Sequence, residues 1–193
     1  MLICTSDIDP IKFIEYREQL REALKLPEIT KSISPYAQMD AFSTSWESPC
    51  VPSCATKTFF SIDGDELLGM CQFQKTTYQD GFIHCTETLA YNFSKKNIIY
   101  GRDYREFYEY LNENVHKVNM SIMGNFSEED FQKPYGKPFE ALLRHLKPYG
   151  GRYVGKFEKH TTNSQGVVVD VHMVEFITKK GKEEFYNKPQ KSC

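Results

Sequence analysis

Three consecutive strand-like segments joined by two short glycine turns constrain the fold of this chain more than any other feature. Residues 58–62 precede Asp63-Gly64-Asp65, residues 66–74 precede a second turn that ends at Gly81, and residues 82–91 complete the set. Tight turns with a glycine where positive φ is needed join antiparallel strands. The sequence therefore predicts three adjacent antiparallel strands.

A helix and a further strand follow this unit. Residues 104–115 carry apolar side chains at i, i+3, i+4, i+7 and i+11, the spacing of one buried helical face. Residues 118–122 alternate between apolar and polar side chains, as a strand does. Because a helix separates this strand from the preceding one, we expect the two strands to lie parallel.

The N-terminal quarter predicts a strand, a helix and a shaped surface segment. Residues 1–6 are mostly apolar, and Asp9-Pro10 is a typical helix start, with apolar residues at helical spacing up to Pro27. The periodicity then weakens, and we expect a short second helix around residues 34–43.

The C-terminal third predicts one helix and two long strands. Residues 139–146 have helical spacing, while residues 152–158 and 167–177 are expected to form antiparallel strands. We therefore expect a single domain over residues 1–177. Residues 178–193 form a Lys-rich tail, which we expect to be loosely held.

The composition is typical of a folded protein. The 193 residues carry a formal charge of −2, with 40% hydrophobic and 26% charged residues. This charge gives no global reason to expect nucleic acid as a partner, although the Lys-rich tail leaves that alternative open. No apolar run approaches the length of a membrane span, and no signal peptide follows Met1, so we expect a cytoplasmic protein without a membrane partner.

Six scattered cysteines favour reduced thiols over a disulfide framework. Cys50 and Cys54 have a spacing that a metal site can use. No second Cys or His pair lies at a suitable spacing nearby, so we expect no metal site.

The order of elements and four motifs resemble the GCN5-related N-acetyltransferase (GNAT) superfamily over nearly the whole chain. Residues 66–73 resemble the family's third strand and residues 82–92 its fourth. Residues 95–102 resemble its pyrophosphate loop. Residues 148–157 and 169–174 resemble the end of the family's fold, where a helix stops at a glycine and two strands follow. The resemblance implies an α/β (α+β) fold with a mixed central sheet of about seven strands flanked by helices, and acetyl-CoA as the cofactor.

Cofactor binding is expected around residues 95–102, where the helix that contains residues 104–115 begins. A diphosphate is held best by unpaired N–H groups at a helix N-terminus with basic side chains beside them. The family has a glycine where this chain has Ile99, and Asp103 brings a negative charge close by. The resemblance assigns cofactor binding to Leu89, Ala90, Tyr91, Lys96, Asn97, Gly101 and Arg102.

The resemblance implies direct transfer of an acetyl group to a small-molecule or protein amine. Glu87 stands on the segment that carries the family's general base, with His84 and His172 as other proton acceptors. The family's tyrosine acid is missing from its usual place. Tyr149 and Tyr135 are nearby substitutes, of which Tyr149 is assigned as the acid. These departures leave two alternatives: a relative that lost transfer and serves as a binding module, or a nucleic-acid-modifying relative.

Overall fold

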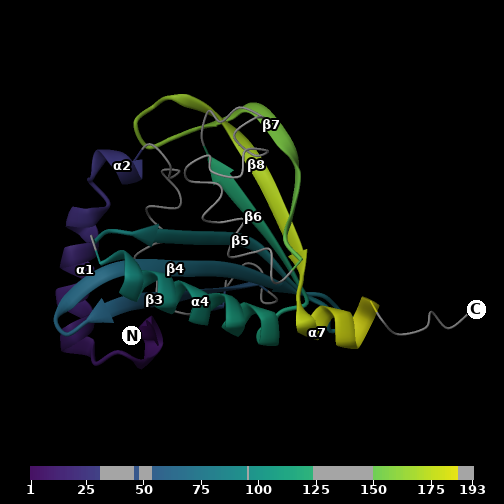
Figure 1. Cartoon of the computed structure of the whole chain (residues 1–193), viewed down its shortest axis with the longest axis horizontal. Coiled ribbons are helices and arrows are strands. Elements are labelled where there is room, and N and C mark those ends of the chain that lie inside the picture. Colours follow the sequence, from purple (N-terminus) through teal and green to yellow (C-terminus); the bar gives the residue numbers. More distant parts are fainter. Residues whose placement is uncertain (31–45, 48–53, 95, 124–149, 187–193) are drawn as a thin grey trace, which may run out of the picture.

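The chain folds around one mixed β-sheet, which positions every element discussed below (Figure 1). The computed structural model describes residues 1–30, 46–47, 54–94, 96–123 and 150–186. The sheet has the strand order β1-β3-β4-β5-β6-β8-β7, with the two-residue β2 paired to β3, which confirms the predicted mixed sheet of about seven strands. The strands are β1 (Leu2–Cys4), β2 (Trp46–Glu47), β3 (Cys54–Asp63), β4 (Glu66–Thr77), β5 (Ile83–Asn92), β6 (Lys117–Met123), β7 (Arg152–Thr162) and β8 (Val168–Ile177).

The two glycine turns build the central part of the sheet as predicted. Gly64 and Gly81 have φ angles of +60° and +82°, which residues with a side chain rarely adopt. Strands β3, β4 and β5 pair antiparallel in that order, and β6 lies parallel to β5. Strand β7 pairs antiparallel with β8, also as predicted.

The helix α1 (Pro10–Ala23) begins as the sequence predicts. The Asp9 carboxylate accepts hydrogen bonds from Ile11 N at 3.0 Å and Lys12 N at 3.2 Å, which satisfies two N–H groups of the first turn. A further helical turn, α2 (Pro27–Thr30), starts where we expected helical structure to stop. The helices expected around residues 34–43 and 139–146, and Cys50, lie outside the described residues.

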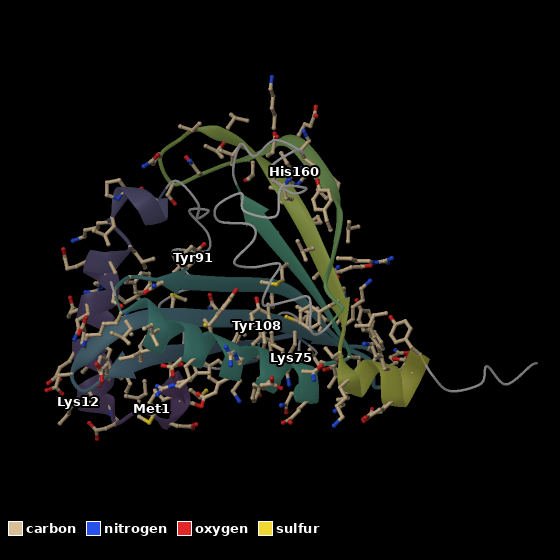
Figure 2. All side chains as sticks on the ribbon, viewed as in Figure 1. Met1, Lys12, Lys75, Tyr91, Tyr108 and His160 are labelled. Atoms are coloured by element: carbon tan, nitrogen blue, oxygen red, sulfur yellow. The ribbon has the colours of Figure 1, made fainter. Side chains whose placement is uncertain are left out.

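The two faces of the sheet bury two apolar clusters. Phe59 and Phe60 are neighbours on β3, and successive strand residues point to opposite faces. Phe59 joins the cluster under helix α4 (Asn97–Asn114), where Tyr108 is completely buried (Figure 2). Phe60 joins the second cluster, which α1 covers with Leu20.

The segment after β8 is fixed to the domain, so the expectation of a loosely held tail is wrong for Thr178–Tyr186. This segment forms α7 (Lys179–Gly181) and the π-helical turn η3 (Lys182–Tyr186), beside the end of α4 (Figure 1). The Thr178 hydroxyl donates to the main-chain oxygens of Val115 and His116. The buried His116 ring also lies 3.0 Å from the Glu184 carboxylate, so both ends of the segment are held.

Gly181 provides a test of this docking. A Cβ atom added there would lie 2.0 Å from the main-chain oxygen of His116. We therefore expect Gly181→Ala to lower the free energy of unfolding by about 2 kcal/mol or more, because the segment must move off the domain. Urea denaturation measures the change. The exposed Lys179→Ala is the control, expected within about 0.5 kcal/mol of the parent; equal effects of the two substitutions would contradict the docking.

Candidate functional site

Strands β5 and β6 separate shortly after they begin, and this separation is the main feature of the candidate site. Their parallel pairing comprises His84 with Lys117 and Cys85 with Val118. Beyond these pairs, β5 continues along β4 as far as Asn92, while β6 continues along β8. The sheet therefore opens between β5 and β6, as the diverging ribbons in Figure 1 show.

A β-bulge in β5 explains why the strands separate at this point. Glu87 is paired with Gln74 of β4 and Cys85 with Lys75, so Thr86 is an extra residue without a partner in that ladder. An extra residue bends its strand and increases the local twist. The bulge directly follows the last pair between β5 and β6, so it turns β5 away from its neighbour.

The bulge also decides which main-chain groups face the opening. Before the bulge, Ile83 O accepts from His116 N, so the main-chain groups of odd-numbered residues face β6. After the bulge, Phe93 N donates to Leu68 O, so the main-chain groups of odd-numbered residues face β4. Main-chain groups alternate along an antiparallel strand. The N–H and C=O groups of Thr88 and Ala90 therefore face the opening, while those of Leu89 and Tyr91 face β4.

The start of α4 lies directly after β5. Ser94 organises the connection: its N–H donates to Asn92 Oδ1 at 3.1 Å, and its hydroxyl accepts from Lys96 N at 3.1 Å. Lys96 is the N-cap residue, and its side chain caps none of the helix N–H groups. The first turn of α4, which starts at Asn97, therefore presents N–H groups without a side-chain cap from this residue.

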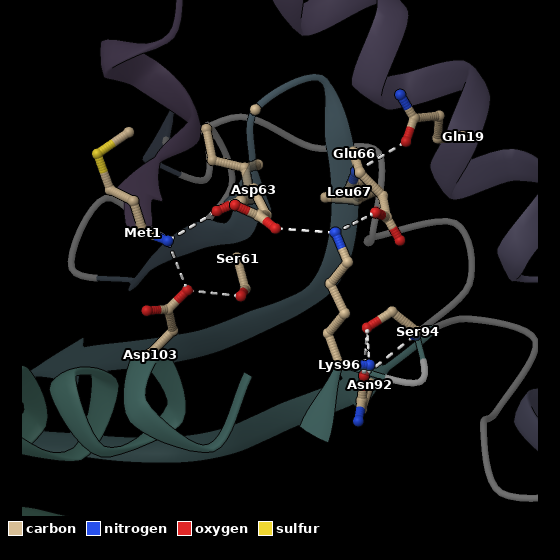
Figure 3. A network of polar contacts seen from close by, with 12 residues as sticks. Met1, Gln19, Ser61, Asp63, Glu66, Leu67, Asn92, Ser94, Lys96 and Asp103 are labelled. Carbon is tan, nitrogen blue, oxygen red and sulfur yellow. Dashed lines mark hydrogen bonds and ion pairs between the residues drawn. The ribbon is translucent and has the colours of Figure 1, made fainter. Parts of the chain in front are cut away.

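The Lys96 ammonium is directed to the β3–β4 turn (Figure 3). It lies 2.8 Å from Asp63 Oδ2 and 2.6 Å from Glu66 Oε2. Hydrogen bonds to these two carboxylates raise the pKa of Lys96. Its positive charge, which we expected at a phosphate, is thus balanced by two acidic side chains.

Asp103 neutralises the other basic group assigned to the cofactor. Its completely buried carboxylate accepts from Ser61 Oγ at 2.7 Å and lies 2.9 Å from the Met1 ammonium (Figure 3). Arg102 donates to the second carboxylate oxygen through Nε and Nη2. Burial alone would raise the pKa of Asp103, but these contacts outweigh burial and lower it. Asp103 therefore joins β3, the N-terminus and α4.

Tyr91 has a packing role in the described structure, whereas Gly101 has none. A Cβ atom at Gly101 would meet nothing within 4 Å, and its φ is not positive. Since a glycine inside a helix costs about 1 kcal/mol relative to alanine, neither packing nor backbone geometry of the described residues explains Gly101. Tyr91, by contrast, packs against the α1 cluster, and burial raises its pKa.

Glu87 and His172 are candidate proton-transfer groups whose positions the structure gives. Glu87 is placed by its main chain opposite Gln74 in the β4–β5 ladder, and Tyr149 lies outside the described residues. His172 is buried on β8, with its Nδ1 3.5 Å from the Tyr153 hydroxyl. Nothing in the sequence assigned a role to Thr86 and Thr88. Ile83 and Cys85 pack in one apolar cluster and Tyr91 in the other, so apolar residues continue at odd positions although the strand changes face at the bulge.

Two kinds of feature are absent from the described residues. No helix in this part of the chain combines the length and apolar character needed to cross a membrane. No group of three or more His, Cys, Asp or Glu side chains among these residues is placed to hold a metal ion.

Comparison with known proteins identifies the fold. No family model matches the sequence, and no curated protein matches it. Among solved structures, the aminoglycoside 6'-N-acetyltransferase from Enterococcus faecium is similar with a TM-score of 0.53 at 11% identity, over 92% of this chain and 96% of that one. An acetyltransferase of the GNAT family from Streptococcus pneumoniae is similar with a TM-score of 0.52 at 10% identity, over 92% and 99% of the two chains.

A third structure, an N-acetyltransferase from Staphylococcus aureus, has a TM-score of 0.52 at 9% identity and covers 92% of this chain and 96% of its own. Similarity over nearly complete chains at such low identity shows a shared fold. The chain thus has the GNAT acyl-CoA N-acyltransferase fold, as the sequence resemblance implied.

The ion pairs of Asp103 generate a stability prediction. Asp103→Asn should lower the free energy of unfolding by about 2 kcal/mol, because the buried side chain loses the negative charge to which Ser61, the Met1 ammonium and Arg102 are bonded. The folded-state pKa lies below the value of about 3.9 in an unfolded chain. The contribution of Asp103 is therefore complete above that pH and is lost as the pH falls below it.

Chemical denaturation of the parent and of Asp103→Asn at several pH values measures this contribution. The difference between the two proteins should shrink as the pH is lowered below about 4. Arg102→Gln is the control, since its side chain is 61% exposed and its removal should cost less than about 1 kcal/mol. A difference that stays constant with pH would show that the Asp103 charge does not stabilise the fold.

Proposed function

We propose that this protein is a cytoplasmic acetyl-CoA-dependent N-acyltransferase of the GNAT superfamily. The observation that carries the proposal is the separation of β5 from β6 after Cys85. Beyond Cys85, the main-chain groups of β5 that face away from β4 are not paired with β6 and lead to the start of α4. An extended amide-containing molecule can therefore pair with the strand and place its phosphates at the helix. The shared fold with known acetyltransferases supports the same function.

In this proposal the main chain, more than charged side chains, holds the cofactor. The N–H groups of Thr88 and Ala90 receive the pantetheine amides and the thioester carbonyl. The first-turn N–H groups of α4, from Asn97 onward, receive the pyrophosphate, because a helix N-terminus favours negative charge. Gly101 lets the phosphates approach closely. Lys96 and Arg102 remain proposed ligands, although carboxylates hold both of them.

The residues of β5 also supply the chemistry in this proposal. Glu87 takes a proton from the acceptor ammonium, so that the free amine attacks the thioester carbonyl. The new C–N bond forms, the C–S bond breaks, and Tyr149 donates a proton to the departing thiolate. A main-chain N–H facing the opening stabilises the oxyanion that develops during the attack. The acceptor is a small-molecule or protein amine.

Substitution by proline tests cofactor binding through the main chain. Ala90→Pro removes the N–H that faces the opening and leaves the ladder to β4 intact, so the protein should fold. We expect at least a tenfold loss of affinity for coenzyme A by isothermal titration calorimetry. Ala90→Ser keeps the N–H and should bind within about threefold of the parent. Unchanged affinity of Ala90→Pro would refute this binding mode.

Gly101→Ala provides a second test of the same binding mode, because it should stabilise the protein and weaken coenzyme A binding. It should raise the free energy of unfolding by about 0.5–1 kcal/mol, because alanine is the better helix former and the added Cβ meets no atom. It should also weaken coenzyme A binding. A stabilised protein that binds coenzyme A as the parent does would show that no ligand approaches Gly101.

Glu87→Gln tests the chemical step. We expect the rate of acetyl transfer to fall at least about a hundredfold, while coenzyme A binds with the parent's affinity, because the amide cannot accept the proton. Transfer is measured as thiol release with a panel of amines. If the parent binds coenzyme A and transfers to no amine, the binding-module alternative replaces the enzyme; if Glu87→Gln retains full activity, another group is the base.

A further inference from the structure

A cavity that is largely open to solvent lies at the opposite end of β5 from the start of α4. Its volume is about 640 Å³. The β4–β5 turn, the first residues of β5 and β6, and the C-terminal segment that ends at Tyr186 surround it. The side chains that matter here are Tyr78, Asp80, Phe82, His84, Lys117 and Tyr186.

Three aromatic rings form one wall of this cavity. The Phe82 ring centroid lies 6.3 Å from that of Tyr78 and 6.3 Å from that of Tyr186. Both tyrosines are 49% exposed, so part of their surface is open to a ligand. Aromatic faces attract ammonium groups and also pack against apolar or aromatic side chains.

The acidic group at the cavity is held by a well-formed turn. Tyr78 N donates to Phe82 O at 2.8 Å, and Gly81 N donates to Tyr78 O at 2.9 Å. Asp80 Oδ1 accepts from Phe82 N at 3.0 Å, which fixes the carboxylate beside the aromatic wall. An ammonium group in the cavity thus finds a carboxylate and ring faces together.

The basic group comes from β6. The Lys117 ammonium lies 2.8 Å from Glu175 Oε2, and Arg152 donates to the other oxygen of the same carboxylate. An ammonium has three N–H donors, so the contact with Glu175 orients Lys117 and leaves donors for a ligand anion. Since Arg152 shares Glu175, Lys117 is not fully neutralised.

His84 adds a polar group to the lining of the cavity. Its Nε2 atom is buried and has no hydrogen-bond partner among the described residues. Burial lowers the pKa of His84, as does the nearby Lys117 ammonium, while a hydrogen bond with the Asn119 side chain opposes the shift. The charged groups that the cavity offers to a ligand are therefore Asp80 and Lys117.

We propose that this cavity binds a zwitterionic α-amino acid. Its ammonium lies against Asp80 and the aromatic wall, and its carboxylate lies against Lys117. One carboxylate and one ammonium in the same cavity match a molecule with one charge of each sign. A polyanion such as a nucleotide would meet a single basic group and be repelled by Asp80. The site is separate from the proposed coenzyme A site and does not depend on it.

Calorimetric titration with three related compounds tests the proposal. L-phenylalanine carries both charges, L-phenylalaninamide lacks the carboxylate, and N-acetyl-L-phenylalanine lacks the ammonium. We expect L-phenylalanine to bind at least tenfold more tightly than either derivative. Equal binding of all three compounds would show a merely apolar cavity, and the absence of heat at 20 mM L-phenylalanine would overturn the proposal.

Two substitutions assign the charges. Asp80→Asn should lower the affinity for L-phenylalanine at least fivefold and leave the affinity for N-acetyl-L-phenylalanine unchanged. Lys117→Gln should also lower the affinity for L-phenylalanine, but it should leave the affinity for L-phenylalaninamide unchanged. Arg152 keeps Glu175 paired in Lys117→Gln. Asp65→Asn, on the exposed β3–β4 turn, is the control and should bind as the parent does. Equal losses in Asp65→Asn and Asp80→Asn would refute the assignment.

Coenzyme A titration of the same variants separates this proposal from the proposed function. Asp80→Asn and Lys117→Gln should keep the parent's coenzyme A affinity, because neither residue lies on the strand edge that opens after Cys85. If the parent fails to bind coenzyme A yet distinguishes the three phenylalanine compounds, the amino-acid site stands and the proposed function fails. The reverse pattern removes the amino-acid site alone.

Discussion

The β-bulge at Thr86 is the local constraint on which the opening of the sheet depends. It ends the pairing of β5 with β6 after Cys85 and lets the two parts of the sheet diverge. Each part still has its own support, since β5 stays paired with β4 and β6 with β8. The opening therefore leaves β5 without its β6 partner on one side, while the ladder to β4 on the other side is kept.

The start of α4 shows how charge is used in this fold. Asp103 is buried and joins the Met1 ammonium, Ser61 and Arg102, and Lys96 is held by acidic groups of the β3–β4 turn. Lys96 and Arg102, the two basic residues assigned to the cofactor, therefore have structural partners. A ligand at this end of α4 would depend on main-chain donors, which are fixed before binding and cost little to arrange.

The C-terminal segment Thr178–Tyr186 both packs against the domain and forms part of the cavity beside Phe82. Thr178 and Gly181 pack against the main chain at the end of α4, and this contact places Tyr186 beside Phe82. The cavity that results contains one carboxylate and one ammonium, from Asp80 and Lys117, at the closed end of the β5–β6 pair. The two ends of β5 thus offer different chemistry: main chain that is not paired with β6 at one end, and fixed side-chain charges at the other.

Turn glycines, caps and periodicity act over a few neighbouring residues, so the hairpins, the Asp9 cap of α1 and the buried face of α4 could be predicted from the sequence, and the same segments indicated the region of the candidate site. Other features became visible only in the folded chain: the bulge at Thr86, the main chain of Ala90 and not Leu89 facing the opening, the ion pairs of Lys96 and the docking of Thr178–Tyr186. Each of these depends on a partner that is distant in the sequence, and residue types alone do not specify that partner.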